Sequence, residues 1–190
     1  VQVLLGLYAP QSGEILFDGV PVREIGLDVV REHVATVLQH PVLFNDSVRN
    51  NLTMGRELHD DALWQVLEKA QLEETICAMP DQLESRLGRQ GVRLSGGQRQ
   101  RLAIARLLLA DPQVVIFDEA TSALDMETEA RLHTALREFL RGRTVLIIAH
   151  RLSAVRQANQ VYVFEDGGIV EQGTHKELIE ADGLYSRLYG

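Results

Sequence analysis

The segment VVIFDEATSALDMETEARLHTALREFLRGRTVLIIAH, residues 114–150, decides the fold. It opens and closes with an apolar run, and the stretch between them is amphipathic, with apolar side chains at Leu132, Leu136, Phe139 and Leu140. That spacing places these side chains on one face of a helix. Short apolar strands that alternate with amphipathic helices are typical of parallel β-α-β units whose sheet is covered on both faces. The segment therefore predicts an α/β fold.

Similar patterns predict further elements on both sides of this segment. A hairpin is expected around Asp18 and Gly19, because aspartate and glycine tolerate the positive φ of a tight turn. Residues 45–110 are helical in character, and their clearest apolar face is formed by Leu63, Val66, Leu67 and Ala70. The remaining expected elements are the tail of a helix over residues 1–8, a strand that ends at Gln39, strands at 161–164 and 168–173, and a closing helix whose capping box is Thr174 and Glu177.

The composition excludes several classes of function. With 19 basic and 27 acidic residues the formal net charge is −8, which argues against a nucleic-acid partner and against a polybasic membrane patch. The single cysteine, Cys77, excludes an internal disulfide and a cysteine-rich metal site. No apolar stretch approaches the roughly 18 residues of a membrane-spanning helix, and no signal-peptide pattern begins the chain. We expect a soluble chain whose partner is not revealed by its charge.

Polar side chains follow three of the apolar runs. Gln39, Asp118 with Glu119, and His150 come at the ends of these runs, and parallel strands would bring them to one edge of the sheet, where α/β proteins bind ligands. Asp118 is placed to hold Mg²⁺ near nucleotide phosphates, and Glu119 is placed to polarise an attacking water as a general base. The alternative is that the two carboxylates favour the start of the next helix, and that His150 is structural.

A glycine pair occurs in LSGGQRQRLAIAR, residues 94–106. Ser95 and Gln98 have capping-box spacing, so this segment starts a helix whose expected buried face is Leu102, Ala105, Leu108 and Leu109. Capping does not explain Gly96 and Gly97, because glycine costs about 0.5 to 1 kcal/mol relative to alanine in a helix. The sharper hypothesis is a contact to a phosphate whose main cradle lies elsewhere, since the chain contains no G-x-x-x-x-G-K-[ST].

The motifs LSGGQ at 94–98, VVIFDEATSALD at 114–125 and IIAHR at 147–151, in this order, resemble the nucleotide-binding domain of an ATP-binding-cassette (ABC) transporter. The resemblance implies a P-loop NTPase-like, mainly parallel sheet flanked by helices. It further implies a RecA-like core over 1–44 and 111–190 and a helical signature subdomain over 45–110. The implied cofactors are ATP and Mg²⁺, and the implied activity is ATP hydrolysis coupled to transport.

The resemblance also implies a role for each candidate residue. Gln39 is the expected Q-loop residue, which senses Mg²⁺ and the transmembrane partner, and Asp118 is the expected Walker B carboxylate that binds Mg²⁺. Glu119 is the expected catalytic base, and His150 is expected to contact the γ-phosphate. The D-loop spans Ser122 to Asp125, and the signature that caps a neighbouring ATP consists of Ser95, Gly96, Gly97 and Gln98.

The segments HPVLFNDSVRNNL and GTHKELIEADGLYSRLY resemble exporter-type domains. This type implies a transmembrane domain fused upstream, a second nucleotide-binding domain in a head-to-tail dimer, and a place on the cytoplasmic face of a membrane, the bacterial inner membrane being the expected one. Two alternatives remain: a soluble ABC ATPase without a transport role, and a regulatory ATP-binding module.

Two departures from the family pattern carry expectations of their own. The Walker A loop of the family would lie just before Val1, so we expect a truncated chain that, alone, neither binds ATP tightly nor hydrolyses it at a useful rate. In LGRQG, residues 87–91, Arg89 and Gln90 stand where exporters usually carry a glutamate, in a loop that touches the transmembrane domain. The second departure puts in question the detail of how this domain is coupled to the transmembrane domain.

Overall fold

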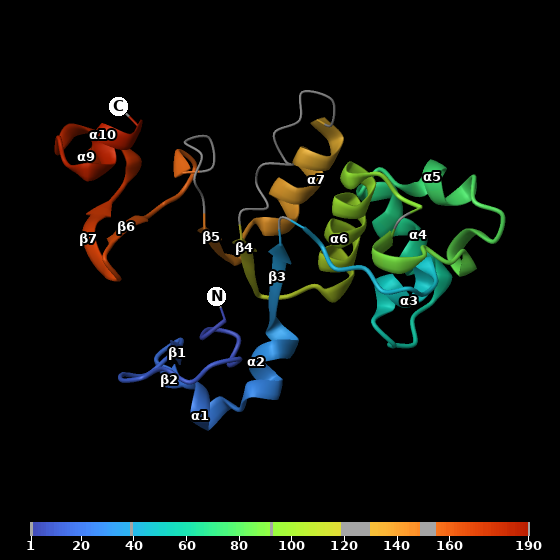
Figure 1. Ribbon diagram of the computed structural model, residues 1–190, viewed down its shortest axis with the longest axis horizontal. Helices are drawn as coiled ribbons and strands as arrows, with labels where there is room; N and C mark the ends of the chain where they lie inside the picture. The colour runs from blue at the N-terminus through green and yellow to red at the C-terminus, as the bar shows by residue number, and fades with distance from the viewer. Residues whose placement is uncertain (1, 39, 92, 119–129, 149–154, 190) are drawn as a thin grey trace. The chain divides into compact units, whose positions relative to one another are not determined.

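The structure is a computed structural model that describes residues 2–38, 40–91, 93–118, 130–148 and 155–189. The chain forms two compact units, Val1–Leu146 and Ile147–Gly190 (Figure 1). Each unit is described by itself. The expected division into a core and a helical subdomain at residues 45–110 remains a prediction.

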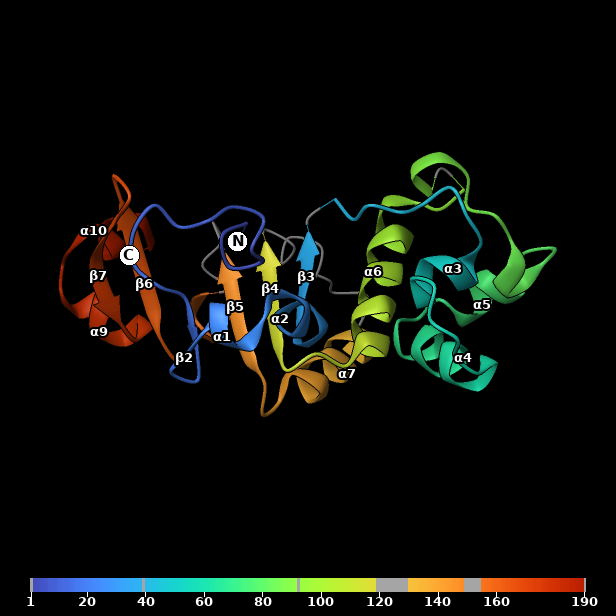
Figure 2. The ribbon, with the colours of Figure 1, turned by 90° about the horizontal axis from the view of Figure 1, so that it is seen from below.

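The larger unit is built around the predicted parallel strands. These are β3 (Val34–Leu38), β4 (Val114–Asp118) and β5 (Thr144–Ile148), in the order β3-β4-β5. β3 and β4 pair in parallel, with Val34 opposite Val114 and Leu38 opposite Asp118, and the three arrows point the same way in Figure 2. β4 is central, so its apolar residues Val115, Ile116 and Phe117 are buried. This arrangement confirms the α/β prediction.

Helices flank these strands along the chain. α1 (Val22–Ile25) and α2 (Leu27–His33) precede β3, α6 (Gly96–Ala110) precedes β4, and α7 (Ala130–Leu140) lies between β4 and β5. Arg143 fixes the turns beside β4, since its guanidinium donates to Pro112 O, to Asp111 Oδ1 at 2.7 Å and to Phe139 O at 2.6 Å. Asp111 ends α6 in the left-handed conformation. The amphipathic pattern of α7 is confirmed, because Leu132 and Leu136 are buried.

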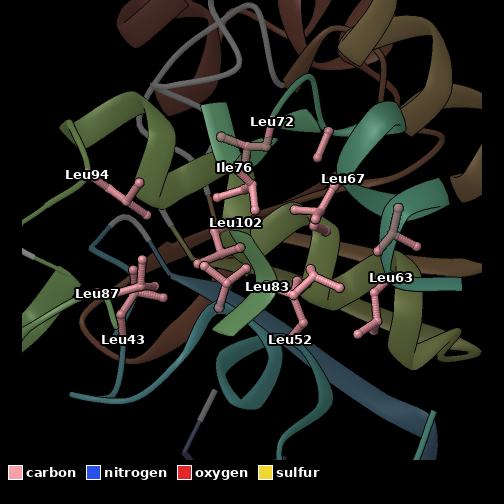
Figure 3. Packing of buried hydrophobic residues seen from close by; sticks show 14 residues of the cluster. Leu43, Leu52, Leu63, Leu67, Leu72, Ile76, Leu83, Leu87, Leu94 and Leu102 are labelled. Atoms are coloured by element: carbon pink, nitrogen blue, oxygen red, sulfur yellow. The ribbon is translucent and has the colours of Figure 1, made fainter. Parts of the chain in front are cut away.

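A cluster of short helices packs against α6. They are α3 (Val48–Thr53), α4 (Asp60–Lys69), α5 (Glu73–Cys77), and the 3₁₀ turns η1 (Gln82–Glu84) and η2 (Arg89–Gly91). Their leucines point toward one another in Figure 3. The apolar face predicted for α4 is confirmed, since all four of its residues belong to this core: Leu63, Val66, Leu67 and Ala70. At the rim, Arg49 pairs with Asp60 at 2.7 Å and with Glu84 at 2.5 Å, which raises the pKa of Arg49.

The buried face of α6 is wider than the sequence predicted. Leu102 and Ala105 are buried as expected, while Leu108 and Leu109 are only partly buried. Ile104 and Leu107 are buried as well. α6 contacts β3 in addition to α3 and α4, so it has packing partners on more than one side and buries more than one stripe.

The helix predicted for residues 1–8 is wrong: residues 2–8 form turns. Gly6 adopts φ 67° and its N–H donates to Val3 O, so the ladder of i→i−4 hydrogen bonds does not develop. A helix needs several successive bonds of this kind to offset the cost of its first turn. The hairpin that follows is confirmed as β1 (Leu16–Phe17) and β2 (Val20–Pro21), with positive φ at Asp18 and Gly19.

The smaller unit contains β6 (Val161–Glu165), β7 (Gly168–Gly173), α9 (His175–Glu180) and α10 (Leu184–Tyr189). β6 and β7 pair antiparallel. Thr174 and Glu177 form the predicted capping box of α9. The carboxylate of Glu171 accepts from the N–H of Leu184 and, at 3.0 Å, from that of Tyr185, and it lies so close to Gly183 that any Cβ there would collide with it.

Candidate functional site

The start of α6 carries the predicted signature residues. Ser95 precedes the helix with extended backbone, and its Oγ accepts from Gln98 N at 3.2 Å. In return, Gln98 Oε1 accepts from Ser95 N at 2.9 Å. The capping box predicted for Ser95 and Gln98 is therefore present, and both side chains bind the backbone of the helix start.

The two glycines have no role inside the described part of the chain. Neither has a positive φ. A Cβ built on Gly97 would meet nothing within 4 Å, and one on Gly96 would meet only the Arg99 guanidinium, at 3.9 Å. Both residues are exposed, and their N–H groups belong to the first turn of the helix, which has no intrahelical acceptor for them. The glycines therefore leave an uncovered strip of backbone N–H groups that an anion from outside can approach.

The turn before α6 is held firmly. Arg99 Nη1 donates to Leu94 O at 2.9 Å, and Leu94 is 3% exposed in the leucine core. Gly91 adopts φ 67°, and a Cβ there would lie 2.5 Å from Leu43 Cδ1. Glycine is required at this position both by the backbone and by the packing. The exposed glycine pair therefore follows a turn that is fixed by a hydrogen bond and by packing against the leucine core.

Asp118 ends β4 at the carboxyl edge of the sheet. The three residues before it are buried, whereas Asp118 is half-buried, and its register partner is Leu38 at the end of β3. Within the described part of the chain, no hydrogen bond or ion pair engages its carboxylate. An uncommitted carboxylate at a strand end is a suitable oxygen ligand for Mg²⁺. Gln39, Glu119, Asp125 and His150 lie outside the described residues, as does Ser122.

The helix start and the strand end lie toward the same end of the larger unit. α6 contacts β3, and only residues 111–113 separate the end of α6 from β4. A 15-residue helix spans about 22 Å and a five-residue strand about 17 Å. Because α6 runs opposite to the strands, its first residues reach toward the carboxyl edge that carries Asp118, as Figure 2 shows.

A buried polar network that the sequence reading missed joins α6 to the segment after Gln39. Asn51 is fully buried: its Oδ1 accepts from Phe44 N at 2.8 Å and its Nδ2 donates to Phe44 O at 3.0 Å. Arg106 of α6 donates to Asn51 O at 2.8 Å and to Val42 O at 3.2 Å. Burial lowers the pKa of Arg106. Arg106 and Asn51 are 55 residues apart in the sequence, so no local pattern indicates this network.

Among the residues that the structure describes, no group of three or more histidine, cysteine, aspartate or glutamate side chains is arranged to hold a metal ion. Among the same residues, no helix combines the length and the apolar character that crossing a membrane requires.

Comparison with known proteins identifies the family. The model of the ABC transporter family matches residues 1–122. The ABC transporter ATP-binding protein YwjA of Bacillus subtilis, itself uncharacterised, is 46% identical over 96% of this chain and 32% of its own length. An ATP-dependent lipid A-core flippase of Burkholderia thailandensis is 46% identical over 100% of this chain and 32% of its own. The chain thus spans about a third of the length of these curated relatives.

A solved structure agrees with these relatives. A bacterial Atm1-family ABC exporter with ATP bound superposes with a TM-score of 0.89 at 35% identity, over 99% of this chain and 33% of that one. The fold is therefore the expected P-loop NTPase-like α/β fold, with a parallel sheet and flanking helices. With the family model matched over more than half of its residues, this chain belongs to the ABC transporter family.

Proposed function

We propose that this chain is the ATP-binding and ATP-hydrolysing domain of an exporter-type ABC transporter, which powers the movement of a substrate across a membrane. Family membership supports ATP as the ligand. The names of the relatives, a lipid A-core flippase and an Atm1-family exporter, support the exporter type. The transported substrate would be chosen by parts of the transporter outside this chain.

The observation that carries the proposal is the glycine pair at the start of α6. No neighbour in the described chain requires Gly96 or Gly97 to lack a side chain, although each costs helix stability. A terminal phosphate of ATP held by a second nucleotide-binding domain would approach the N–H groups of these two residues. Ser95 and Gln98 hold the helix start in place for that contact.

The remaining candidate residues take roles around the same ATP. Asp118 and Gln39 would hold Mg²⁺, which neutralises charge on the phosphates as phosphoryl transfer proceeds. Glu119 would orient the attacking water and accept its proton, and His150 would contact the γ-phosphate. Asp125 would lie in the loop that faces the second domain. Phosphoryl transfer needs mainly positioning and charge stabilisation, which this set of residues supplies.

The proposed partners follow from the exporter type. They are a transmembrane domain and a second nucleotide-binding domain in a head-to-tail dimer. The length of the relatives, about three times that of this chain, supports a fused transmembrane domain. The proposed location is the cytoplasmic face of a membrane, the bacterial inner membrane in particular. ATP would bind the closed dimer better than the separated domains, so binding and hydrolysis would drive the conformational cycle.

The proposal is tested by Glu119→Gln in the full-length protein, reconstituted in nanodiscs. ATP turnover should fall at least a hundredfold, while ATP binding measured by filter retention should stay within threefold. Unchanged turnover would remove Glu119 from the role of general base. A full-length protein without membrane-spanning helices would favour the soluble ATPase, and ATP binding without any hydrolysis in the unsubstituted protein would favour the regulatory module.

A further inference from the structure

The side chain of Arg99, in the first turns of α6, runs back over the start of the helix. Its Nη1 donates to Leu94 O at 2.9 Å. Its Nη2 lies 3.9 Å from the position that a Cβ of Gly96 would take, and its Cδ lies 3.4 Å from the corresponding position at Gly91. Helical side chains lean toward the N-terminus, which favours this course. The guanidinium therefore lies beside the exposed glycine pair.

Most hydrogen-bond donors of this guanidinium are uncommitted. Arginine carries five side-chain N–H groups. In the part of the chain that the structure describes, only the bond to Leu94 O engages them, and no carboxylate pairs with Arg99, although the sequence contains 27 acidic residues. The side chain is nonetheless partly buried. A partly buried cation has lost hydration that an anion from outside can replace.

The charge of Arg99 adds to that of the helix start. The N-terminus of a helix carries a partial positive charge, which acidic side chains stabilise and basic side chains do not. α6 has no acidic residue in its first turn. In the free chain the two positive charges repel each other, and both of them attract a phosphate. The arrangement costs stability in the chain alone and gains it when an anion is bound.

The guanidinium is also held in place before any ligand arrives. Its partner Leu94 is 3% exposed and belongs to the leucine core (Figure 3). Its aliphatic part packs against Gly91, which lies against Leu43. An ordered side chain loses little conformational entropy on binding. The planar fork of an arginine matches the geometry of phosphate oxygens, so Arg99 is suited in shape as well as in charge.

We propose that Arg99 is a further phosphate ligand of the ATP site proposed above, and that it makes this site prefer ATP over ADP. Its free N–H groups bind the terminal phosphate of the ATP held by the second nucleotide-binding domain, beside the N–H groups of Gly96 and Gly97. ADP lacks that phosphate, so the two positive charges repel again once phosphate has left. The inference rests on the proposed function for the second domain and its ATP. It adds a residue that distinguishes the two nucleotides.

Nucleotide binding by the full-length protein in nanodiscs tests this role without hydrolysis. Filter retention gives the dissociation constants of the ATP analogue AMP-PNP and of ADP, both with Mg²⁺. Arg99→Met and Arg99→Lys have side chains of similar length and differ in charge. We expect Arg99→Met to weaken AMP-PNP binding at least fivefold and ADP binding less than twofold. Arg99→Lys should weaken AMP-PNP binding less than threefold. Arg141→Met, a control that removes the same charge from an exposed position, should change neither constant.

Ionic strength provides the second measurement. Added salt should weaken AMP-PNP binding more in the unsubstituted protein than in Arg99→Met, because ions screen a contact between charges. Equal weakening of AMP-PNP and ADP binding in Arg99→Met, or no weakening of either, would overturn the inference and leave Arg99 only the turn at Leu94 to hold. If Arg99→Met does not fold, Arg99→Gln replaces it with the same expectations. An unsubstituted protein that binds neither nucleotide would contradict the proposed function itself.

Discussion

Gly97 is a residue whose small size serves no contact within the described part of the chain. A methyl group there would meet no atom within 4 Å, and its φ is ordinary for a helix. We therefore predict that Gly97→Ala raises the free energy of unfolding by up to about 1 kcal/mol, since alanine is the better helix former. In the full-length protein the same change should lower ATP turnover at least tenfold, because the methyl group covers the N–H groups offered to phosphate.

Denaturant unfolding and an ATPase assay measure these two effects. Gly168→Ala is a matched control in the smaller unit, because a Cβ at Gly168 would make only an ordinary contact, 3.7 Å from Glu165 O. That control should leave turnover unchanged. If Gly97→Ala kept full turnover, the glycine pair would have no part in ATP hydrolysis.

Arg106 acts through several carbonyl groups at once. It donates to Asn51 O, Val42 O and, at 3.4 Å, Asn51 Oδ1. Arg106→Met leaves these acceptors without their donor, and we predict a loss of about 1–3 kcal/mol in the free energy of unfolding. Hydrogen exchange of the Phe44 N–H should accelerate, because the bond to Asn51 loses its support. Arg141→Met, on an exposed residue, should change stability by less than about 0.5 kcal/mol. Equal losses in both variants would contradict this role.

At the scale of elements, α6 is stabilised by its contact with the leucine core. Leu102 has no exposed surface, whereas Leu108 on the same helix is only partly buried. Leu102→Ala should cost about 2–5 kcal/mol in the free energy of unfolding, because it leaves a cavity that the surrounding helices cannot fill. Leu108→Ala should cost clearly less. Chemical denaturation of the two variants checks the ranking, and a reversed order would mean that α6 packs through a different face.

The start of α9 should respond to acid. Glu177 accepts from Thr174 N at 2.8 Å and from Thr174 Oγ1 at 2.9 Å, and these hydrogen bonds lower the pKa of Glu177. A pKa that is lower in the folded than in the unfolded chain stabilises the cap above the unfolded value of 4.5, and this stabilisation is lost as the pH falls through the folded pKa. We predict that the NMR shift of the Thr174 N–H titrates below pH 4.5. Glu177→Gln should abolish that titration.

Elements with a local signal were predictable from the sequence. The apolar runs of β3, β4 and β5, the Asp18-Gly19 turn and both capping boxes depend on residues within a few positions of one another. The turn at residues 2–8 was missed, because the conformation of Gly6 outweighed an apolar pattern. The short helices α1 and α2 were not predicted, since four and seven residues give too little periodicity to detect.

The candidate site shows the same difference between residues with a local sequence signal and residues without one. Ser95, Gln98 and Asp118 stand where their motifs predicted, because each follows directly from a helix start or a strand end. The link from Arg106 to Asn51 and Val42 could not be predicted, since it depends on tertiary packing between distant segments. The roles of Gln39, Glu119, Asp125 and His150 remain predictions.

At the scale of the whole molecule, residues 1–190 offer a proposed cap for ATP but no phosphate-binding loop that would hold it. Residues 1–190 contain the signature at 94–98 and no G-x-x-x-x-G-K-[ST]. We predict that the 190-residue chain alone binds ATP more weakly than micromolar, because a helix start with few charge-assisted contacts cannot hold a triphosphate tightly. Isothermal titration calorimetry measures this affinity. A micromolar dissociation constant would show that the chain has a cradle of its own.

The parallel pairing of β3 with β4 also has a consequence for the order of folding. Val34 pairs with Val114, and the whole of α3, α4, α5 and α6 lies between them in the chain. Contacts within the helical cluster close shorter loops than the pairing of β3 with β4, which therefore costs more chain entropy. The helices should therefore gather first and bring the two strands together. A nascent chain that has emerged from the ribosome only as far as Ala110 would already contain all residues of the leucine core. β3 could not yet pair with β4, because β4 begins at Val114.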